Sequence, residues 1–256
     1  MTMLIVVDDA AVPADLIGSS RRLANAAGWE MRGVHVHAPG GPELADDAAD
    51  GLEVVELEGD PAAAISQLVE GAHVDAVAVG LPAQKAGRPG PLAESLLARL
   101  SAPLLLVRPG MRPVAGLRRL LVPLEGSPSG SAAMRHADDA LCKRGREIIM
   151  LHVVTGSTPR EEGSFPAPRI VDQEHYEWSA WQEEFCMRFS QCPEGGRHRV
   201  CVRVGEPAPT IVKESEALGA ELIVLSWNGT FEGGHGAVVK TLMKTAPCPL
   251  LIVPAG

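Results

Sequence analysis

The sequence predicts an α/β fold built from two copies of one unit, each a five-stranded parallel sheet with flanking helices. Three observations predict it: the two halves of the chain align with each other, apolar runs alternate with helical patterns, and the composition is aliphatic. Strands that are apolar along their whole length are typical of a parallel sheet covered on both faces. The composition of 46% hydrophobic but only 4% aromatic residues suits Val/Ile/Leu strands and Ala/Leu helices.

The internal repeat is the strongest of these signals. From Gly59 to Gly110 the first half aligns with the second without gaps, at a constant offset of 146 residues. At the start of each half the offset is 116, so the second half has about thirty additional residues between Val154 and Val200. Matched pairs include Gly59 with Gly205, Pro61 with Pro207, Gly90 with Gly236, and Pro103 with Pro249. We therefore expect one domain over residues 1–110 and a second over residues 117–256, joined by a short linker.

The second half shows the complete pattern of alternating strands and helices. The predicted strands are residues 120–124, 148–154, 200–204, 221–226 and 250–253. The predicted helices are residues 129–143, 174–189, 210–218 and 237–245. The helix at 174–189 lies in the additional residues and carries aromatic side chains at helical spacing: Trp178, Trp181, Phe185 and Phe189. Two interpretations stay open for it, a helix that packs on its own sheet and a surface for a partner.

The first half is a shortened version of the same unit. A polar stretch rich in Gly, Pro and Asp, residues 39–50, stands where the second helix would be. We expect this domain to lack that helix and its sheet to be less covered on one side. Asp60 is a predicted N-cap, with Pro61 at the first position of the following helix.

Charge and cysteine content exclude several classes of function. The formal net charge is −9, and no basic stripe appears, so binding to duplex nucleic acid or to an anionic membrane is disfavoured. The five cysteines are odd in number and form no CxxC pair, which argues against a disulfide framework or a zinc site. No apolar run approaches the length of a membrane span, and no basic leader precedes the first strand, so a cytoplasmic location is expected.

Candidate ligand residues follow the strands, because ligands of such sheets bind beyond the carboxyl ends of the strands. Asp9 and Glu125 follow the first strand of each half, where a carboxylate would bond a ribose or adenine edge, or simply cap a helix. The loop after the fourth strand is Gly-rich in both halves, and its N–H groups would cradle a phosphate. Glycines are equally ordinary turn residues, so this signal is weak by itself. The candidates here are Ser226, Asn228, Gly229, Gly236, Ala237 and Lys240 in the second half, and Gly80 and Gly90 in the first.

Several of these segments resemble the universal stress protein family. They are Gly205-Glu206-Pro207, the strand at 220–225, the run 246–253, and residues 122–127 before an Ala-rich helix. The resemblance covers both halves. It implies a Rossmann-like sheet in each unit and a pairing of the two units through their last strands, 104–107 and 250–253. A tandem chain would make that pair internally, as a pseudo-dimer.

The loops depart from the pattern G-x2-G-x9-G-[ST] of the nucleotide-binding members. In the second half Ser226 replaces the first glycine, only six residues separate Gly229 from Gly236, and Ala237 stands at the hydroxyl position. In the first half Ala83 replaces the middle glycine, and Pro91 removes both the hydroxyl and an N–H. Glu125 replaces the usual Asp, and Glu232 would repel a phosphate. We expect ATP binding to be weak or absent and to lie in the second half if it occurs.

The leading interpretation is a stress-associated, non-enzymatic binding or regulatory protein whose partner is a small molecule or another protein. The alternative is a slow ATPase or another nucleotide-using enzyme of the same fold. The sequence contains no GxxxxGK[ST], HExxH or GxSxG motif. No catalytic or metal-ligating residues are predicted, ATP is the only candidate cofactor, and a homodimer is a further candidate assembly.

Overall fold

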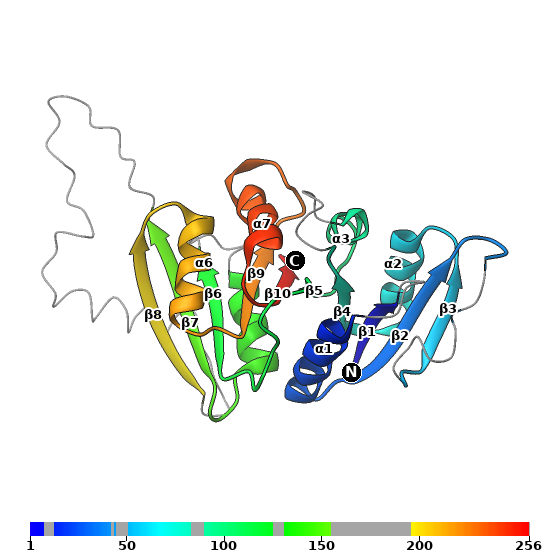
Figure 1. The fold of residues 1–256 in the computed structure, drawn as a ribbon, viewed down its shortest axis with the longest axis horizontal. Helices are drawn as coiled ribbons and strands as arrows, with labels where there is room; N and C mark the ends of the chain where they lie inside the picture. Colours follow the sequence, from blue (N-terminus) through cyan, green and yellow to red (C-terminus); the bar gives the residue numbers. More distant parts are fainter. Residues whose placement is uncertain are drawn as a thin grey trace, which may run out of the picture.

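In the computed structural model, residues 1–7, 13–41, 44, 51–82, 90–124, 131–154 and 196–255 are described. They form one mixed sheet of ten strands with helices on both faces (Figure 1). The predicted helix at 174–189, with its four aromatic residues, lies outside the described residues, as do Asp9 and Glu125. Within the described ranges no helix is both long and apolar enough to cross a membrane.

The elements of the first half alternate as the sequence predicts. They are β1 (Thr2–Val7), α1 (Ala14–Ala27), β2 (Glu30–His37), β3 (Val54–Glu58), α2 (Pro61–Ala72), β4 (Val74–Gly80), α3 (Pro91–Leu97) and β5 (Leu104–Val107). Those of the second half are β6 (Arg119–Leu124), α4 (Ser131–His136), the π-helix η2 (Ala137–Leu141), β7 (Glu147–Val154), β8 (Arg197–Val204), α6 (Pro207–Ala217), β9 (Leu222–Trp227), α7 (Gly233–Thr245) and β10 (Leu250–Pro254).

The strand order shows the repeat directly. It runs β3-β2-β1-β4-β5-β10-β9-β6-β7-β8, so each half has its third strand at an outer edge and its fifth strand at the centre. All pairs within a half are parallel, whereas β5 and β10 are antiparallel, with Leu105 opposite Leu251. The predicted pairing of 104–107 with 250–253 is confirmed, as is the α/β fold of two similar units. This pairing removes two apolar strand edges that would otherwise stay open.

The core consists of one apolar layer on each face of the sheet, and both layers run through the two halves. Because side chains alternate along a strand, Leu104 and Leu250 enter one layer while Leu105 and Leu251 enter the other. All four side chains are at most 1% exposed. The antiparallel junction is therefore part of the common core.

The segment between the halves is held by hydrogen bonds to the second half. The Glu221 carboxylate accepts the backbone N–H groups of four successive residues, Ala115 to Arg118, at 2.6 to 3.1 Å. Burial alone would raise the pKa of this carboxyl, but the four backbone hydrogen bonds outweigh it and hold the pKa below its usual value. The N–H of Arg112 also donates to the carbonyl of Pro247 at 2.7 Å.

Two local expectations have different outcomes. Asp60 caps α2 as predicted, because its side chain accepts the N–H of Ala63 at 2.9 Å and Pro61 is the first helical residue. The last helix of the second half was expected to begin at Ala237, but α7 begins at Gly233. The glycines before Ala237 carry no side-chain cap that would mark this earlier start in the sequence.

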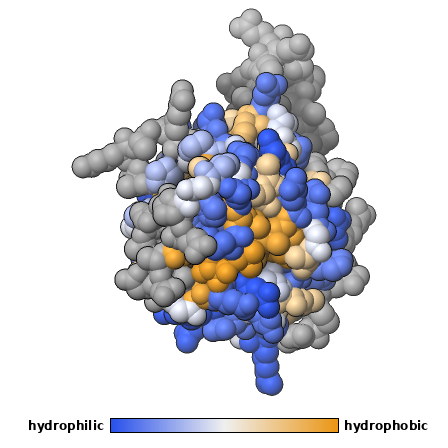
Figure 2. Space-filling model, turned by 90° about the vertical axis from the view of Figure 1, so that its right-hand side faces the viewer, coloured by the Kyte–Doolittle hydropathy of each residue, from blue (hydrophilic) through white to orange (hydrophobic). Residues whose placement is uncertain are grey.

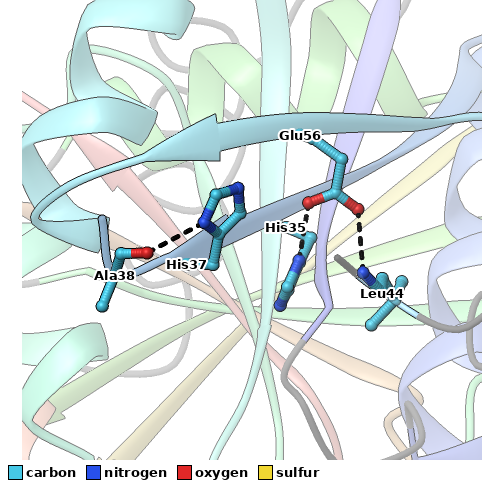
Figure 3. A network of polar contacts seen from close by, with 5 residues as sticks. All are labelled: His35, His37, Ala38, Leu44 and Glu56. Carbon is cyan, nitrogen blue, oxygen red and sulfur yellow. Dashed lines mark hydrogen bonds and ion pairs between the residues drawn. The ribbon is translucent and has the colours of Figure 1, made fainter. Parts of the chain in front are cut away.

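A polar pair of side chains lies on β2 and β3, the strands on either side of the segment at 39–50. None of the described residues between these strands is helical, and the remainder of the segment lies outside the described residues. His35 is 1% exposed, and its Nδ1 lies 2.7 Å from Oε2 of Glu56, whose Oε1 accepts the N–H of Leu44 (Figure 3). A histidine–carboxylate pair thus stands where a covered sheet would carry apolar residues.

The outer end of the first half is formed by β2, β3 and α2. Apolar residues gather in the middle of this end, surrounded by hydrophilic ones (Figure 2). The half-buried side chains of Val54, Val55 and Leu57 on the edge strand β3 belong to this end. It is less completely covered than the centre of the sheet, where β4, β5, β10 and β9 are almost wholly buried.

Candidate functional site

Each half has a cavity beyond the carboxyl ends of its strands, where a doubly wound sheet is expected to bind ligands. The cavity of the second half has a volume of about 240 Å³ and lies between β6, β7, β9 and the first turns of α6 and α7. The cavity of the first half has a volume of about 480 Å³ and lies between β1, β2, β4 and the first turns of α1, α2 and α3. We call them the C-terminal cavity and the N-terminal cavity.

The C-terminal cavity has apolar walls with polar groups on one side. Leu124, Leu151 and Val153 come from the ends of β6 and β7, and Ile211 comes from α6. The polar side is formed by Ser226, at the end of β9, and by the start of α7. An apolar floor of this kind suits a flat organic group, and the polar side would fix its orientation.

His235 is the residue of this cavity that the sequence did not single out. It lies in the first turn of α7 and lines the cavity, and its Nε2 is 2.7 Å from the backbone carbonyl of Ser226. Because a carbonyl only accepts, Nε2 carries the proton in this bond. The available signal was a single histidine among glycines, in Gly233-Gly234-His235-Gly236, directly before the expected helix start.

Gly236 lies in a different environment from the phosphate-binding loop that the sequence suggested. It lies inside the first turn of α7, and a Cβ atom built on it would be 2.4 Å from the backbone oxygen of Thr230 and 2.6 Å from the backbone of Phe231. Glycine at this position lets the loop after β9 pack directly against the helix. The N–H groups at the helix start belong instead to Gly233, Gly234 and His235.

The remaining predicted residues of the loop lie around the cavity rather than in its wall. Asn228 is exposed, and its Oδ1 accepts the N–H of Thr230, while Gly229 has a left-handed φ of 85°. Ala237 and Lys240 are exposed on α7, and the Lys240 Nζ is 5.9 Å from the centre of the Phe231 ring. Of the predicted residues in the second half, the structure places Ser226 in the cavity wall.

The N-terminal cavity is lined by both of the predicted residues of its half that are described. Gly80 ends β4, and Gly90 is the N-cap residue of α3. A Cβ atom on Gly90 would be 3.2 Å from the Pro82 ring, and one on Gly80 would be 3.7 Å from Leu16. The rest of the wall consists of aliphatic residues and prolines from the strand ends and the helix starts.

The two histidines near the ends of β2 and β7 have backbone partners. Nδ1 of His152 is 3.0 Å from the carbonyl of Leu124, and Nδ1 of His37 is 3.0 Å from the carbonyl of Ala38 (Figure 3). Leu124 ends the neighbouring strand β6, and Ala38 directly follows β2, the strand of His37 itself. Such bonds to backbone carbonyls are expected for histidines that position a loop.

One cluster of side chains has the composition of a metal site. Its possible ligand atoms lie within 4.8 Å of one another and come from Asp138, Cys142 and His198. His198 Nε2 is 2.7 Å from Asp138 Oδ1, which makes a buried ion pair if the histidine is protonated. Cys142 is disulfide-bonded, contrary to the expectation from cysteine number and spacing, so its sulfur is not available as a thiolate ligand. The cluster therefore does not form a metal site in this state.

The strand order, the helix arrangement and the two cavities define a tandem Rossmann-like α/β protein. The solved structure of a universal stress protein from Archaeoglobus fulgidus has a TM-score of 0.69 and 16% identity, and the match covers 99% of this chain and 98% of that chain. A putative universal stress protein from Pseudomonas aeruginosa has a TM-score of 0.63 and 11% identity, with 99% and 92% covered. At these identities the likeness shows the fold.

The family follows from the sequence itself. The model of the universal stress protein family matches residues 116–254, which is more than half of the chain, and the chain therefore belongs to the universal stress protein family. No curated protein sequence matches the chain.

Proposed function

We propose that this chain is a non-enzymatic, stress-associated binding protein, made of units at 1–110 and 117–256, and that the second unit takes a small organic ligand in the C-terminal cavity. The observation that carries the proposal is the cavity itself: an apolar floor from β6 and β7 faces the uncapped N-terminus of a 13-residue helix, α7. A helix N-terminus favours a negative or electron-rich group, and the floor favours a ring.

The same geometry argues for binding rather than catalysis. Ser226 and His235 both line the cavity, but the histidine is bonded to the serine's carbonyl and not to its hydroxyl. A nucleophilic serine needs a base that takes the proton of its hydroxyl. This arrangement commits Nε2 of the histidine to the carbonyl, and among the described residues no base is hydrogen-bonded to the hydroxyl.

Adenine nucleotide is the first ligand class to test, and we expect its affinity to be low. The phosphate would meet the N–H groups of Gly233 and Gly234, whereas the hydroxyl of the family pattern is absent at Ala237. Glu232 is exposed at the N-cap position, with no hydrogen bond from its side chain to the helix, so its charge opposes an anion.

The experiment has two parts. Mass spectrometry of the native purified protein identifies any retained ligand, and calorimetric titration with ATP and magnesium measures the affinity for nucleotide. We expect a dissociation constant weaker than about 10 μM. Tight binding together with steady ATP hydrolysis would contradict both the low affinity and the non-enzymatic role.

A variant locates the site without disturbing the fold. A Cβ atom on Gly234 would meet nothing within 4 Å, so Gly234→Asp adds a carboxylate at the cavity wall without a clash. We expect this variant to lose an anionic ligand and Gly234→Ala to keep it. Equal binding by both variants would show that the ligand lies elsewhere.

A further inference from the structure

We propose that the N-terminal cavity is a second site of a different kind, which binds a neutral, largely apolar small molecule and not a nucleotide. It lies at the position in the first half that corresponds to the C-terminal cavity. The inference goes beyond the proposed function, because it concerns the other half of the chain and another class of ligand.

Among the residues that the structure describes, none that lines the N-terminal cavity has an ionisable or hydroxyl side chain. Every residue of the described chain that lines it is aliphatic, proline or glycine, as illustrated by Val36, Val79 and Leu92. Among these described side chains a charged ligand would find no ionic partner to replace its hydration, whereas an apolar ligand would gain by leaving water. Its volume of about 480 Å³ falls in the range of small-molecule sites.

The helix starts around this cavity have lost N–H donors. Of the prolines that line it, three stand at helix starts: Pro13 is the N-cap residue of α1, and Pro61 and Pro91 are the first residues of α2 and α3. Proline has no N–H, so each helix presents one donor fewer to an anion than another residue would give. Three such positions around one cavity select against phosphate.

The charge near α2 acts in the same direction. Asp60 accepts the N–H of Ala63, so the first turn of this helix has its own carboxylate. A second anion at the same helix start would be repelled and would compete for the same donors. The matched residue of the second half, Glu206, makes no such cap bond.

Glycine keeps the space open at the end of β4. A Cβ atom on Gly80 would make ordinary contacts with Leu16 at 3.7 Å and with Pro13 at 3.9 Å, both of which line the cavity. A methyl group is therefore tolerated there, and a larger side chain would fill the space between these residues. Gly80 and Ser226 are equivalent in the repeat, so the same substitution can be made in each cavity.

Two probes with the same ring system test the class of ligand. N-phenyl-1-naphthylamine is neutral, whereas 8-anilino-1-naphthalenesulfonate carries a sulfonate, and both become fluorescent in apolar surroundings. We expect the neutral probe to bind the full-length protein with one site and at least about tenfold more tightly than the anionic probe at that site. An equal or greater affinity for the anionic probe would overturn the proposal.

Variants then locate the site. Gly80→Leu should weaken the neutral probe at least about tenfold, while Gly80→Ala should leave it bound. Loss of the probe in Ser226→Leu instead would place it in the C-terminal cavity and overturn the proposal. Since a loss of binding in Gly80→Leu would also follow from a disturbed fold, Leu92→Glu provides a second variant. The Leu92 side chain is half-buried at the start of α3, and a carboxylate there should weaken the neutral probe while circular dichroism stays unchanged. Unchanged binding in Leu92→Glu would also contradict the assignment.

The outcome is independent of the test for nucleotide. ATP can fail to bind in the second half while the neutral probe still binds at Gly80. Equally, ATP can bind in the second half while the neutral probe fails to bind, so the two experiments fail separately. Failure of the probe experiment would leave the C-terminal cavity as the ligand site of the chain.

Discussion

The helices α3 and α7 occupy the same place in the repeat but begin differently. Gly90 and Gly236 are equivalent positions, yet Gly90 is the N-cap residue of α3, whereas Gly236 is already the fourth residue of α7. The additional turn of α7 brings Gly234 and His235 into the cavity wall. In the first half the helix starts later, with a proline, and the cavity is about 480 Å³ instead of about 240 Å³. Among the described residues, the additional turn therefore puts a histidine side chain in the wall of the smaller cavity, whereas the larger cavity is lined by aliphatic residues, prolines and glycines.

The largest expected effect comes from substituting the two equivalent glycines. Gly236→Ala places a methyl group 2.4 Å from a backbone oxygen, which forces the loop or the helix to move, and we expect a loss of about 3 kcal/mol in the free energy of unfolding. Among the described residues, the methyl group of Gly90→Ala would meet the Pro82 ring at 3.2 Å, and this substitution should cost about 1 kcal/mol. Urea denaturation of both variants measures the difference. Equal losses would show that the two helix starts are packed alike.

A second prediction concerns the contact that joins the end of β9 in the second half to α3 in the first half. Trp227 is 3% exposed, and its Nε1–H donates to the carbonyl of Leu97, at the end of α3, at 2.6 Å. Trp227→Phe keeps most of the ring but removes this donor, so we expect a loss of about 1–2 kcal/mol in thermal or urea unfolding. A stability equal to that of the unchanged protein would mean that the bond contributes nothing to the junction.

A third prediction concerns the linker between the halves and its dependence on pH. The pKa of Glu221 is lowered in the folded protein, so its stabilising effect is present above the unfolded pKa and is lost as the pH falls through the folded pKa. Glu221 is only partly buried, so Glu221→Gln should cost about 1 kcal/mol at neutral pH after allowance for solvent screening. The difference from the unchanged protein should vanish in acid. A difference that grows on acidification would contradict this role of the carboxylate.

The smallest effects are expected on the surface of α7. Glu232→Gln removes a negative charge from the helix N-terminus and should improve ATP affinity a few-fold, about 0.5–1 kcal/mol. Lys240→Gln removes a cation that lies over the Phe231 ring and should change ATP affinity less than about twofold. Calorimetry on both variants compares them. A large loss of affinity in Lys240→Gln would show that this lysine leaves the ring and contacts the ligand.

The fold was predictable because several independent signals agree. The gapless repeat, the apolar strands and the Asp60-Pro61 helix start each depend on short-range patterns that the structure preserves. The pairing of β5 with β10 followed from the family resemblance and from two apolar strands that would otherwise be open edges. These features can be predicted from a single sequence because the burial of apolar side chains fixes the residue types that form them.

The site was less predictable because it depends on where one helix starts. Glycines at 229, 233, 234 and 236 permit several starting points, and the family pattern favoured Gly236. The structure shows that packing against Thr230 and Phe231 explains this glycine, which a sequence cannot reveal since the contact is between backbones. His235 was missed for the same reason: its role depends on the turn that precedes Gly236.

The central claim is that the two halves hold separate sites of different chemistry. Its most direct test is a competition titration of the full-length protein, in which N-phenyl-1-naphthylamine is bound first and ATP with magnesium is then added to saturation. We predict that the probe stays bound, because it occupies the N-terminal cavity while any nucleotide occupies the C-terminal cavity. Stoichiometric displacement of the probe by ATP would contradict the claim, since it would place both ligands in one site.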